Sequence, residues 1–431
     1  MSRSPSPHHD PGHRRVGAFR LQPLSLALLL AWLPAWFPVF PSAALAQSPA
    51  RTTLPSGMTV VQGQASTVTN GARLTITNSA NALLNWQSFS IGSDAAVRFE
   101  QPDAASRVLN RVSGNDPSAI FGQLSSNGQV WLLNPNGVLF GQGARIDVAG
   151  LVASTLNIGD APWRAGRTLL TAGDSAPSAG VVNQGELRTT TGGYVLLVGG
   201  VGGVGGAGGV RNEGVIDAPG GRVALAAGRS INLADSSTPN LVVRVDTSPG
   251  DPGSVSNLGR ISAAGGRIDL AAAIVNQSGI VRADTLDDLA GHVSLRGSES
   301  VTTSATSLTS ASARASAGTG TGGSAGTILV DSGPAGTSLL AGQWLALAES
   351  ASGQGGQIRL LGERVALLDG ARVDASGARG GGEVLVGGGA QGRDPTVRNA
   401  RAAYIASTAR IAADATGEGN GGRIVVWGSD S

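Results

Sequence analysis

The chain has 431 residues, of which 41% are hydrophobic, 14% are charged and 66 are glycine. The glycine content favours many tight turns over long helices, the lack of a Gly-X-Y period excludes collagen, and the many Val, Ile and Leu residues between the glycines exclude simple disorder. The chain contains no cysteine, so packing and backbone ladders must hold it together in place of disulfides.

Residues 1–46 have the pattern of a secretory signal peptide. Four arginines precede an apolar run at residues 24–33, and Ala44-Leu45-Ala46 matches the small-x-small cleavage pattern. We therefore predict cleavage between Ala46 and Gln47. A membrane anchor is the alternative, but the ten-residue apolar core is about half of the roughly 20 residues that a spanning helix needs.

Removal of this segment changes the charge balance. The 31 basic and 29 acidic residues become 27 and 28, so the formal net charge falls from +2 to −1. No basic stripe remains to bind nucleic acid. His292 is then the last histidine, and with no cysteine the sequence predicts neither a zinc nor a thiolate site. We expect no metal and no cofactor.

The stretch "LLNPNGVLFG" at 132–141 interrupts an apolar run with a turn. Asn, Pro and Gly stand at the first, second and fourth positions that a type I turn favours, and apolar strand ends flank them. The pattern therefore predicts a corner at Asn134 to Gly137. Turn chemistry alone leaves open whether this corner is also recognised by a partner.

Three segments of about 20 residues, beginning at Val181, Val210 and Val255, align with one another. Each carries an asparagine, a glycine two residues later, a short alternating run, a Gly-Gly pair and a second alternating run. Period-two patterns bounded by glycine predict short strands joined by turns. Units this small cannot bury an apolar face alone, so they must stack on their neighbours.

This pattern predicts an all-β chain, a right-handed parallel β-helix with short extra β-hairpins. We expect the repeated asparagines to form a ladder of hydrogen bonds from rung to rung. The pattern returns beyond residue 350. Residues 301–325 are rich in Ser, Thr, Ala and Gly and predict a linker or long loop, which would separate a domain at 47–300 from a repeat stalk at 326–431. We expect the chain to stop inside that stalk.

The segments "NWQSFSIG" (85–92) and "VLNRVSGNDPSAIFGQLSSNGQVWLLNPNGVLFGQGARIDVAGLVASTL" (108–156) resemble the secretion domain of two-partner-secretion exoproteins, the filamentous haemagglutinin family. An upstream Asn-Pro-Asn-Leu motif of many members is missing from "FEQPDAASRVLNRV", which is similar to the high-molecular-weight adhesin subgroup. The resemblance implies a Gram-negative exoprotein that is exported through the periplasm and the outer membrane to the cell surface or medium.

The resemblance also implies a partner and a motif. The partner is an outer-membrane β-barrel transporter, which binds the secretion domain through its periplasmic POTRA domains. The motif required for secretion falls on Asn134, Pro135, Asn136 and Gly137. Most family members are adhesins, so a receptor on a host or bacterial surface is a further expected partner. A contact-dependent growth-inhibition toxin or a haemolysin stalk is the alternative within the family.

A β-helical enzyme acting on polysaccharide is the alternative from another class. Such a site needs several carboxylates on one face, whereas the one adjacent acidic pair, Asp287-Asp288, points to opposite faces if it lies in a strand. His292 has no nucleophile at a suggestive spacing, and we expect it on the surface. The Gly200-x-Gly202-x-x-Gly205 spacing lacks the helix that a dinucleotide site requires. We therefore expect no catalytic residue.

Overall fold

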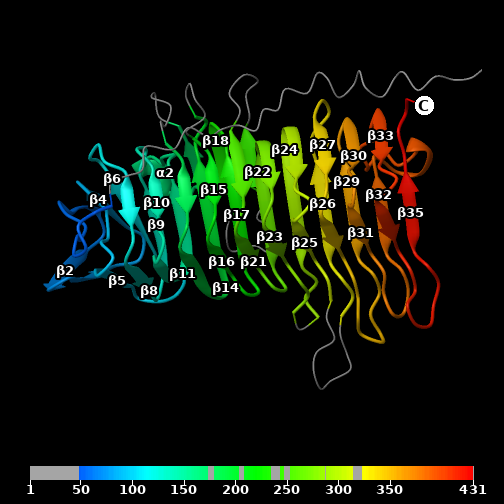
Figure 1. Ribbon diagram of the computed structural model, residues 1–431. Coiled ribbons are helices and arrows are strands. Elements are labelled where there is room, and N and C mark those ends of the chain that lie inside the picture. Colours follow the sequence, from blue (N-terminus) through cyan, green and yellow to red (C-terminus); the bar gives the residue numbers. More distant parts are fainter. Residues whose placement is uncertain are drawn as a thin grey trace, which may run out of the picture. The chain divides into compact units, whose positions relative to one another are not determined.

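The computed structural model describes residues 48–172, 179–202, 208–233, 243–246, 253–286, 288–313 and 323–430. The predicted signal peptide, with its cleavage site at Ala46 and Gln47, lies outside these residues, and so does Asp287. Within residues 48–430 the strands follow one another in chain order, as the colour sequence of Figure 1 shows.

The strands of the β-helix form three ladders. Along the chain, successive strands join the first ladder, then the second and then the third, and the next turn repeats this order. The first ladder contains β7 (Ser118–Ile120), β10 (Val138–Phe140), β13 (Val181–Asn183), β15 (Val210–Asn212), β20 (Ser254–Asn257), the ends of β22 (Arg267–Gln277) and β24 (His292–Thr303), β27 (Thr337–Leu340), β30 (Arg364–Leu367) and β33 (Ala402–Ile405).

The second ladder contains β2 (Ala65–Asn70), β3 (Arg73–Asn78), β5 (Ala96–Glu100), β8 (Gln123–Ser126), the starts of β11 (Arg145–Ser154) and β14 (Glu186–Gly199), β16 (Val215–Asp217), β21 (Arg260–Ser262), β23 (Ile280–Arg282), β25 (Leu308–Ser310), β28 (Gln343–Leu345), β31 (Arg372–Asp374) and β34 (Arg410–Ala412).

The third ladder contains β1 (Thr59–Gln62), β4 (Ala82–Trp86), β6 (Arg107–Val112), β9 (Gln129–Leu133), the ends of β11 and β14, β17 (Arg222–Ala227), the starts of β22 and β24, β26 (Thr327–Asp331), β29 (Gln357–Leu361), β32 (Glu383–Val386) and β35 (Arg423–Val426). Among the described strands of the three ladders, β1 with β4 and β2 with β3 pair antiparallel, and the other pairs are parallel. The parallel β-helix predicted from the repeats is confirmed.

The aligned sequence repeats stack in register. Val181 lies opposite Val210, and Val210 lies opposite Val255. All three side chains point into the central core and are at most 3% exposed. Burying a valine fully stabilises a fold by about 1.5–3 kcal/mol. Repetition of this position therefore supplies a continuous apolar core that no single rung could form.

The predicted asparagine ladder is also confirmed. The Nδ2 of Asn183 donates to the Oδ1 of Asn212 at 2.8 Å, and the Nδ2 of Asn212 donates to the Oδ1 of Asn257 at 2.7 Å. Asn257 in turn donates to the Oε1 of Gln277 at 2.7 Å. All four side chains are 0% exposed. Each amide thus donates to the next rung and, except in the first, accepts from the previous one, as buried amides require.

The Gly-Gly corners have two separate causes. Gly220 has φ +61°, a left-handed conformation that glycine adopts without strain. Gly221 is not in that region, but a Cβ on it would collide with the carbonyl oxygen of Gly193 on the preceding rung. The first glycine of the pair therefore turns the chain, and the second lets the rungs approach.

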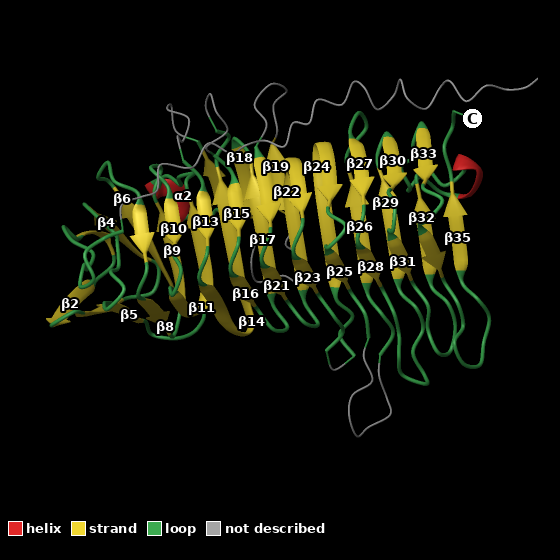
Figure 2. Ribbon diagram, in the orientation of Figure 1, coloured by secondary structure: helices red, strands yellow, loops and turns green. Residues whose placement is uncertain are grey.

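A second apolar cluster lies on the outer side of the third ladder. It contains Trp131, Leu196 and Ala224 from the ladder, together with residues of α2 (Asp160–Arg164) and of the antiparallel sheet β12 (Leu169–Thr171), β18 (Ser230–Leu233) and β19 (Val243–Asp246). Figure 2 shows α2 as one of the red segments. The third ladder is therefore apolar on both faces over β4 to β17, unlike an alternating, half-exposed strand.

The predicted linker or loop at 301–325 needs correction over residues 301–313. Residues 301–303 end β24, and β25 continues the second ladder at Leu308–Ser310. Ala311 and Ala313 are fully buried in the core. Ser and Thr fit this rung because their small side chains bond to neighbouring backbone. Thr303 Oγ1, for example, donates to the carbonyl of Ala341 at 2.9 Å. Residues 314–322 lie outside the described residues.

Candidate functional site: the Asn134 to Gly137 corner

The corner joins β9 of the third ladder to β10 of the first. The amide of Gly137 donates to the carbonyl of Asn134 at 3.0 Å, which closes the predicted turn. Gly137 has φ +118°, and a Cβ there would lie 3.0 Å from the Cβ of Ala179. A side chain at this position would be strained and crowded, so glycine is required by the backbone itself.

Asn134 is a structural residue by its contacts. Its side chain is 0% exposed. The Nδ2 donates to the carbonyl of Asp116 and to the Oγ of Ser118, both at 3.0 Å, and the Oδ1 accepts from the amide of Asn136 at 2.9 Å. The carboxamide therefore ties the corner to the loop at 113–117 of the preceding rung.

Asn136 makes a second tie to the same loop. Its Nδ2 donates to the carbonyl of Gly114 at 2.8 Å and to the Oδ1 of Asn134 at 3.2 Å. Its Oδ1 accepts no hydrogen bond from the described residues, and the side chain is partly exposed. Pro135 is exposed. The outward surface of the corner is therefore the proline ring and one carboxamide oxygen.

These contacts define what the corner can do chemically. Carboxamides and a proline ring supply neither a general base nor a nucleophile. The four carboxamide donations hold the corner rigid, and a net value of about 1 kcal/mol each places their sum at a few kcal/mol. The arrangement presents a preformed, uncharged surface of small area, which suits recognition by another protein.

The partner loop of the corner was not predicted from the sequence. Gly114, Asp116 and Ser118 accept the amide groups of Asn134 and Asn136, although they lie 16 to 22 residues earlier. The Asn-Asp-Pro run at 115–117 is a turn signal that predicts a loop. Only the stacking of rungs, however, brings that loop against the corner.

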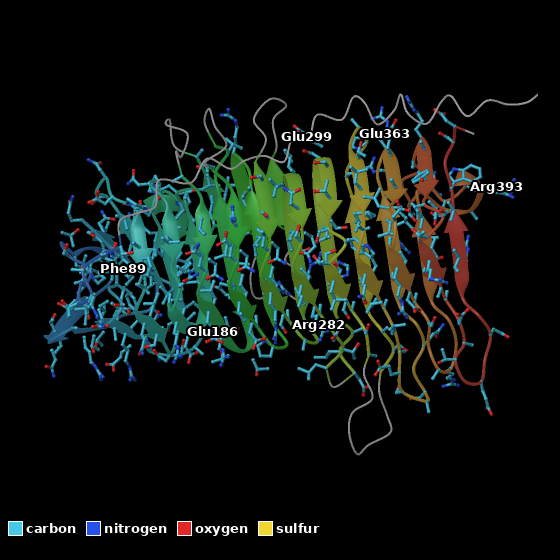
Figure 3. All side chains as sticks on the ribbon, in the orientation of Figure 1. Phe89, Glu186, Arg282, Glu299, Glu363 and Arg393 are labelled. Carbon is cyan, nitrogen blue, oxygen red and sulfur yellow. The ribbon has the colours of Figure 1, made fainter. Side chains whose placement is uncertain are left out.

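The remaining residues weighed from the sequence do not form a second site. His292 is half-buried in β24, which corrects the surface position that we expected. Burial, aided by the charge of Arg267, lowers its pKa to about 4. Asp288 has φ +65° in a turn. Glu186 and Arg282, labelled in Figure 3, come from β14 and β23 of the second ladder, with β16 and β21 between them.

Two further properties of the described residues bear on other functions. No group of three or more His, Cys, Asp or Glu side chains in the described part could hold a metal ion. No helix in the same part of the chain is long and apolar enough to cross a lipid bilayer. The Gly200-x-Gly202-x-x-Gly205 spacing lies partly outside the described residues, and the next described element after it is strand β15.

Comparison with known proteins adds four findings. Residues 51–257 match the family model of the TPS secretion domain. A heme/hemopexin-binding protein of Haemophilus influenzae (strain Rd) is 36% identical over 194 residues, which are 43% of this chain and 20% of that protein. A second heme/hemopexin-binding protein of Haemophilus influenzae is 49% identical over 80 residues, 19% of this chain and 9% of that protein.

The fourth finding concerns a solved structure. The crystal structure of the HMW1 secretion domain from Haemophilus influenzae aligns with a TM-score of 0.64 and 29% sequence identity, covering 87% of each chain. The matches to the curated relatives span only a fifth or less of their length. These proteins are a secretion domain and two binding proteins, and none is named as an enzyme.

Proposed function

We propose that residues 51–257, which match the family model of the TPS secretion domain, direct export of this chain across the outer membrane through a dedicated β-barrel transporter. The transporter would bind the domain through its periplasmic POTRA domains. The observation that supports this most is the family match over 51–257 together with the solved secretion domain that aligns over 87% of the chain. Export would leave the chain at the cell surface or in the medium.

The signal peptide completes the proposed route. Residues 1–46, cleaved between Ala46 and Gln47, would carry the chain into the periplasm before the transporter acts. N-terminal sequencing of the exported protein tests this step, and we expect Gln47 as the first residue. A first residue far downstream of Gln47 would contradict it.

Within the corner, we propose a division between structure and recognition. Asn134 and Gly137 are buried and shape the turn, whereas Pro135 and the Oδ1 of Asn136 face outward and are available to the transporter. The Nδ2 of Asn136 serves the fold through Gly114. An aspartate at 136 would set a carboxylate against the carbonyl of Gly114, so that change would affect folding and recognition together.

Pro135→Ala separates the two roles. The exposed ring makes no hydrogen bond, and loss of its preset φ costs about 0.4–1 kcal/mol of stability. If the transporter contacts the ring, binding to purified POTRA domains should weaken by about 1–3 kcal/mol while the melting temperature falls only slightly. Pro395→Ala, in an exposed loop far along the chain, is the matched control and should leave binding unchanged.

The outcome that contradicts recognition is also defined. Equal POTRA affinity for the wild type and Pro135→Ala would show that the transporter does not contact the proline ring. Asn134→Ala should lower both stability and export, because it leaves Ser118 and the carbonyl of Asp116 without the buried donor. Export of Asn134→Ala at the wild-type level would refute its structural role.

For the rest of the chain we propose an adhesive stalk. The three ladders continue beyond residue 257 in the same parallel pairing as far as β33, β34 and β35. A stack of this kind can display a receptor-binding surface away from the cell. Adherence of bacteria to cultured host cells, compared with a deletion strain, tests this. Undiminished adherence of the deletion strain would contradict it.

A further inference from the structure

A pocket of about 360 Å³ lies on the outer side of the third ladder near its C-terminal end. Its floor comes from β29, β32 and β35, and its wall is the loop at 387–399 that includes η1 (Ala390–Gly392). Figure 2 shows η1 beside β35, and Figure 3 labels Arg393 there. The charged lining residues are Arg359, Glu383, Arg393, Asp394 and Arg423.

The wall of this pocket is preformed by its own contacts. Asn399 braces the loop, because its Oδ1 accepts from the amide of Gly389 at 3.2 Å and its Nδ2 donates to the carbonyl of Gly392 at 3.1 Å. Val397 is 4% exposed and packs with Leu361 and Leu385. A small-molecule site needs such a fixed wall, because ordering a loose loop would oppose binding.

The charges in the lining are unbalanced. Three arginines face two carboxylates, so the pocket carries one excess positive charge. Both carboxylates are already engaged. Glu383 lies between Arg359 at 3.6 Å and Arg423 at 3.4 Å, and the Oδ1 of Asp394 accepts from the amide and hydroxyl of Thr396.

The arginines retain unused hydrogen-bonding capacity. The Nε of Arg359 is buried without a hydrogen-bond partner, and the Nη2 of the same side chain lies 3.6 Å from the Oε2 of Glu383, which is too long for a hydrogen bond. Arg393 is exposed on the loop. Guanidinium groups pair with planar oxyanions through two parallel N–H donors. Neither Arg359 nor Arg393 makes such a paired interaction within the described residues.

We propose that this pocket binds the carboxylate of a small, sugar-sized acidic molecule. Arg359 and Arg393 would hold the carboxylate, and Glu383 and Asp394 would accept hydrogen bonds from neutral hydroxyl groups of the same ligand. One negative charge on the ligand matches the one excess positive charge of the pocket. The volume lies at the lower end of the range for small-molecule sites, about 300–1,000 Å³. The site lies outside residues 51–257 and is independent of export.

The test is titration of the purified full chain with galacturonate, with galactose as the neutral match of the same ring size. Calorimetry or ligand-observed NMR measures binding. We expect saturable binding of galacturonate and at least ten-fold weaker binding of galactose. Arg393→Gln should weaken galacturonate binding at least five-fold, and Arg359→Gln should do the same. Arg410→Gln removes the same charge from β34, outside the pocket, and should leave the affinity unchanged.

Four results would overturn the proposal. Equal binding of galactose and galacturonate would show that charge is not recognised, and inorganic sulfate binding as tightly as galacturonate would refute the carboxylate assignment. Unchanged affinity in Arg393→Gln would remove the pocket as the site, and because this residue is exposed, its replacement should not disturb folding. The absence of any galacturonate binding at millimolar concentration would also refute it.

Discussion

Replacing Asn212 by alanine tests whether the asparagine ladder stabilises the stack. Asn212 accepts from Asn183 and donates to Asn257, and all three side chains are fully buried. In Asn212→Ala the Nδ2 of Asn183 loses its acceptor and the Oδ1 of Asn257 loses its donor. A buried polar group left unpaired costs about 1–3 kcal/mol, so the two together predict a loss of about 2–6 kcal/mol in the free energy of unfolding.

The assay is urea unfolding of the purified protein, followed by circular dichroism. Because rungs of a solenoid can unfold separately, hydrogen exchange of the Gly185 amide, which donates to Asn183, gives a local measure beside the global one. Asn420→Ala, at an exposed asparagine, is the matched control and should change stability by less than about 0.5 kcal/mol. Equal stabilities for the two variants would refute the reasoning.

Three further predictions concern other parts of the fold. Tyr194→Phe removes the hydroxyl that accepts from the Nε1 of Trp131 at 3.2 Å and donates to the Oε1 of Gln129 at 2.7 Å. This change should destabilise the protein by about 1–3 kcal/mol in urea unfolding. Trp131→Phe should then cost less stability in the Tyr194→Phe background than it does alone. Gly221→Ala should destabilise the protein by about 1–3 kcal/mol or more, because the new Cβ would meet the carbonyl of Gly193. Gly421→Ala is the control and should be tolerated, because the nearest neighbour of a Cβ there lies 3.8 Å away. Similar melting temperatures for the two variants would contradict the close approach of the rungs. The pKa of His292 is lowered from 6.5 to about 4, so the unfolded chain binds the proton more tightly than the folded chain does. The contribution of His292 to stability should therefore be fully present above pH 6.5 and lost as pH falls through about 4. His292→Gln should reduce this loss in thermal melts over that pH range, and an unchanged pH profile would show that His292 does not cause it.

The repeating part of the fold could be predicted because its causes are local and recur. Val181, Val210 and Val255 mark the rungs, and each is followed by an asparagine at the same spacing. Since parallel rungs stack in register, equal positions in the repeat must become neighbours. The asparagine ladder follows from that geometry, and the structure places Asn183, Asn212 and Asn257 in hydrogen-bond contact.

Features that depend on contacts between unlike segments could not be predicted. The outer apolar cluster joins Trp131 of β9 to Trp163 of α2 at a ring distance of 5.3 Å, and nothing repeats in that pairing. The prediction of a loop at 301–313 was wrong because it rested on the low hydrophobicity of this Ser/Thr-rich stretch. In the structure, its small hydroxyl side chains donate hydrogen bonds to the backbone of adjacent rungs. At the corner, turn chemistry predicted the backbone of Asn134 to Gly137 but not its ties to Gly114 and Asp116.

Export of the full chain with and without its transporter tests the central claim most directly. The chain would be expressed in a Gram-negative host that lacks a transporter of this family, alone or together with the cognate β-barrel protein. We measure the amount in the medium and on the surface by protease accessibility in intact cells. The account predicts export only when the transporter is present, and export that falls when Asn134 is replaced by alanine. Equal export without the transporter, or retention in the periplasm despite it, would contradict the assignment.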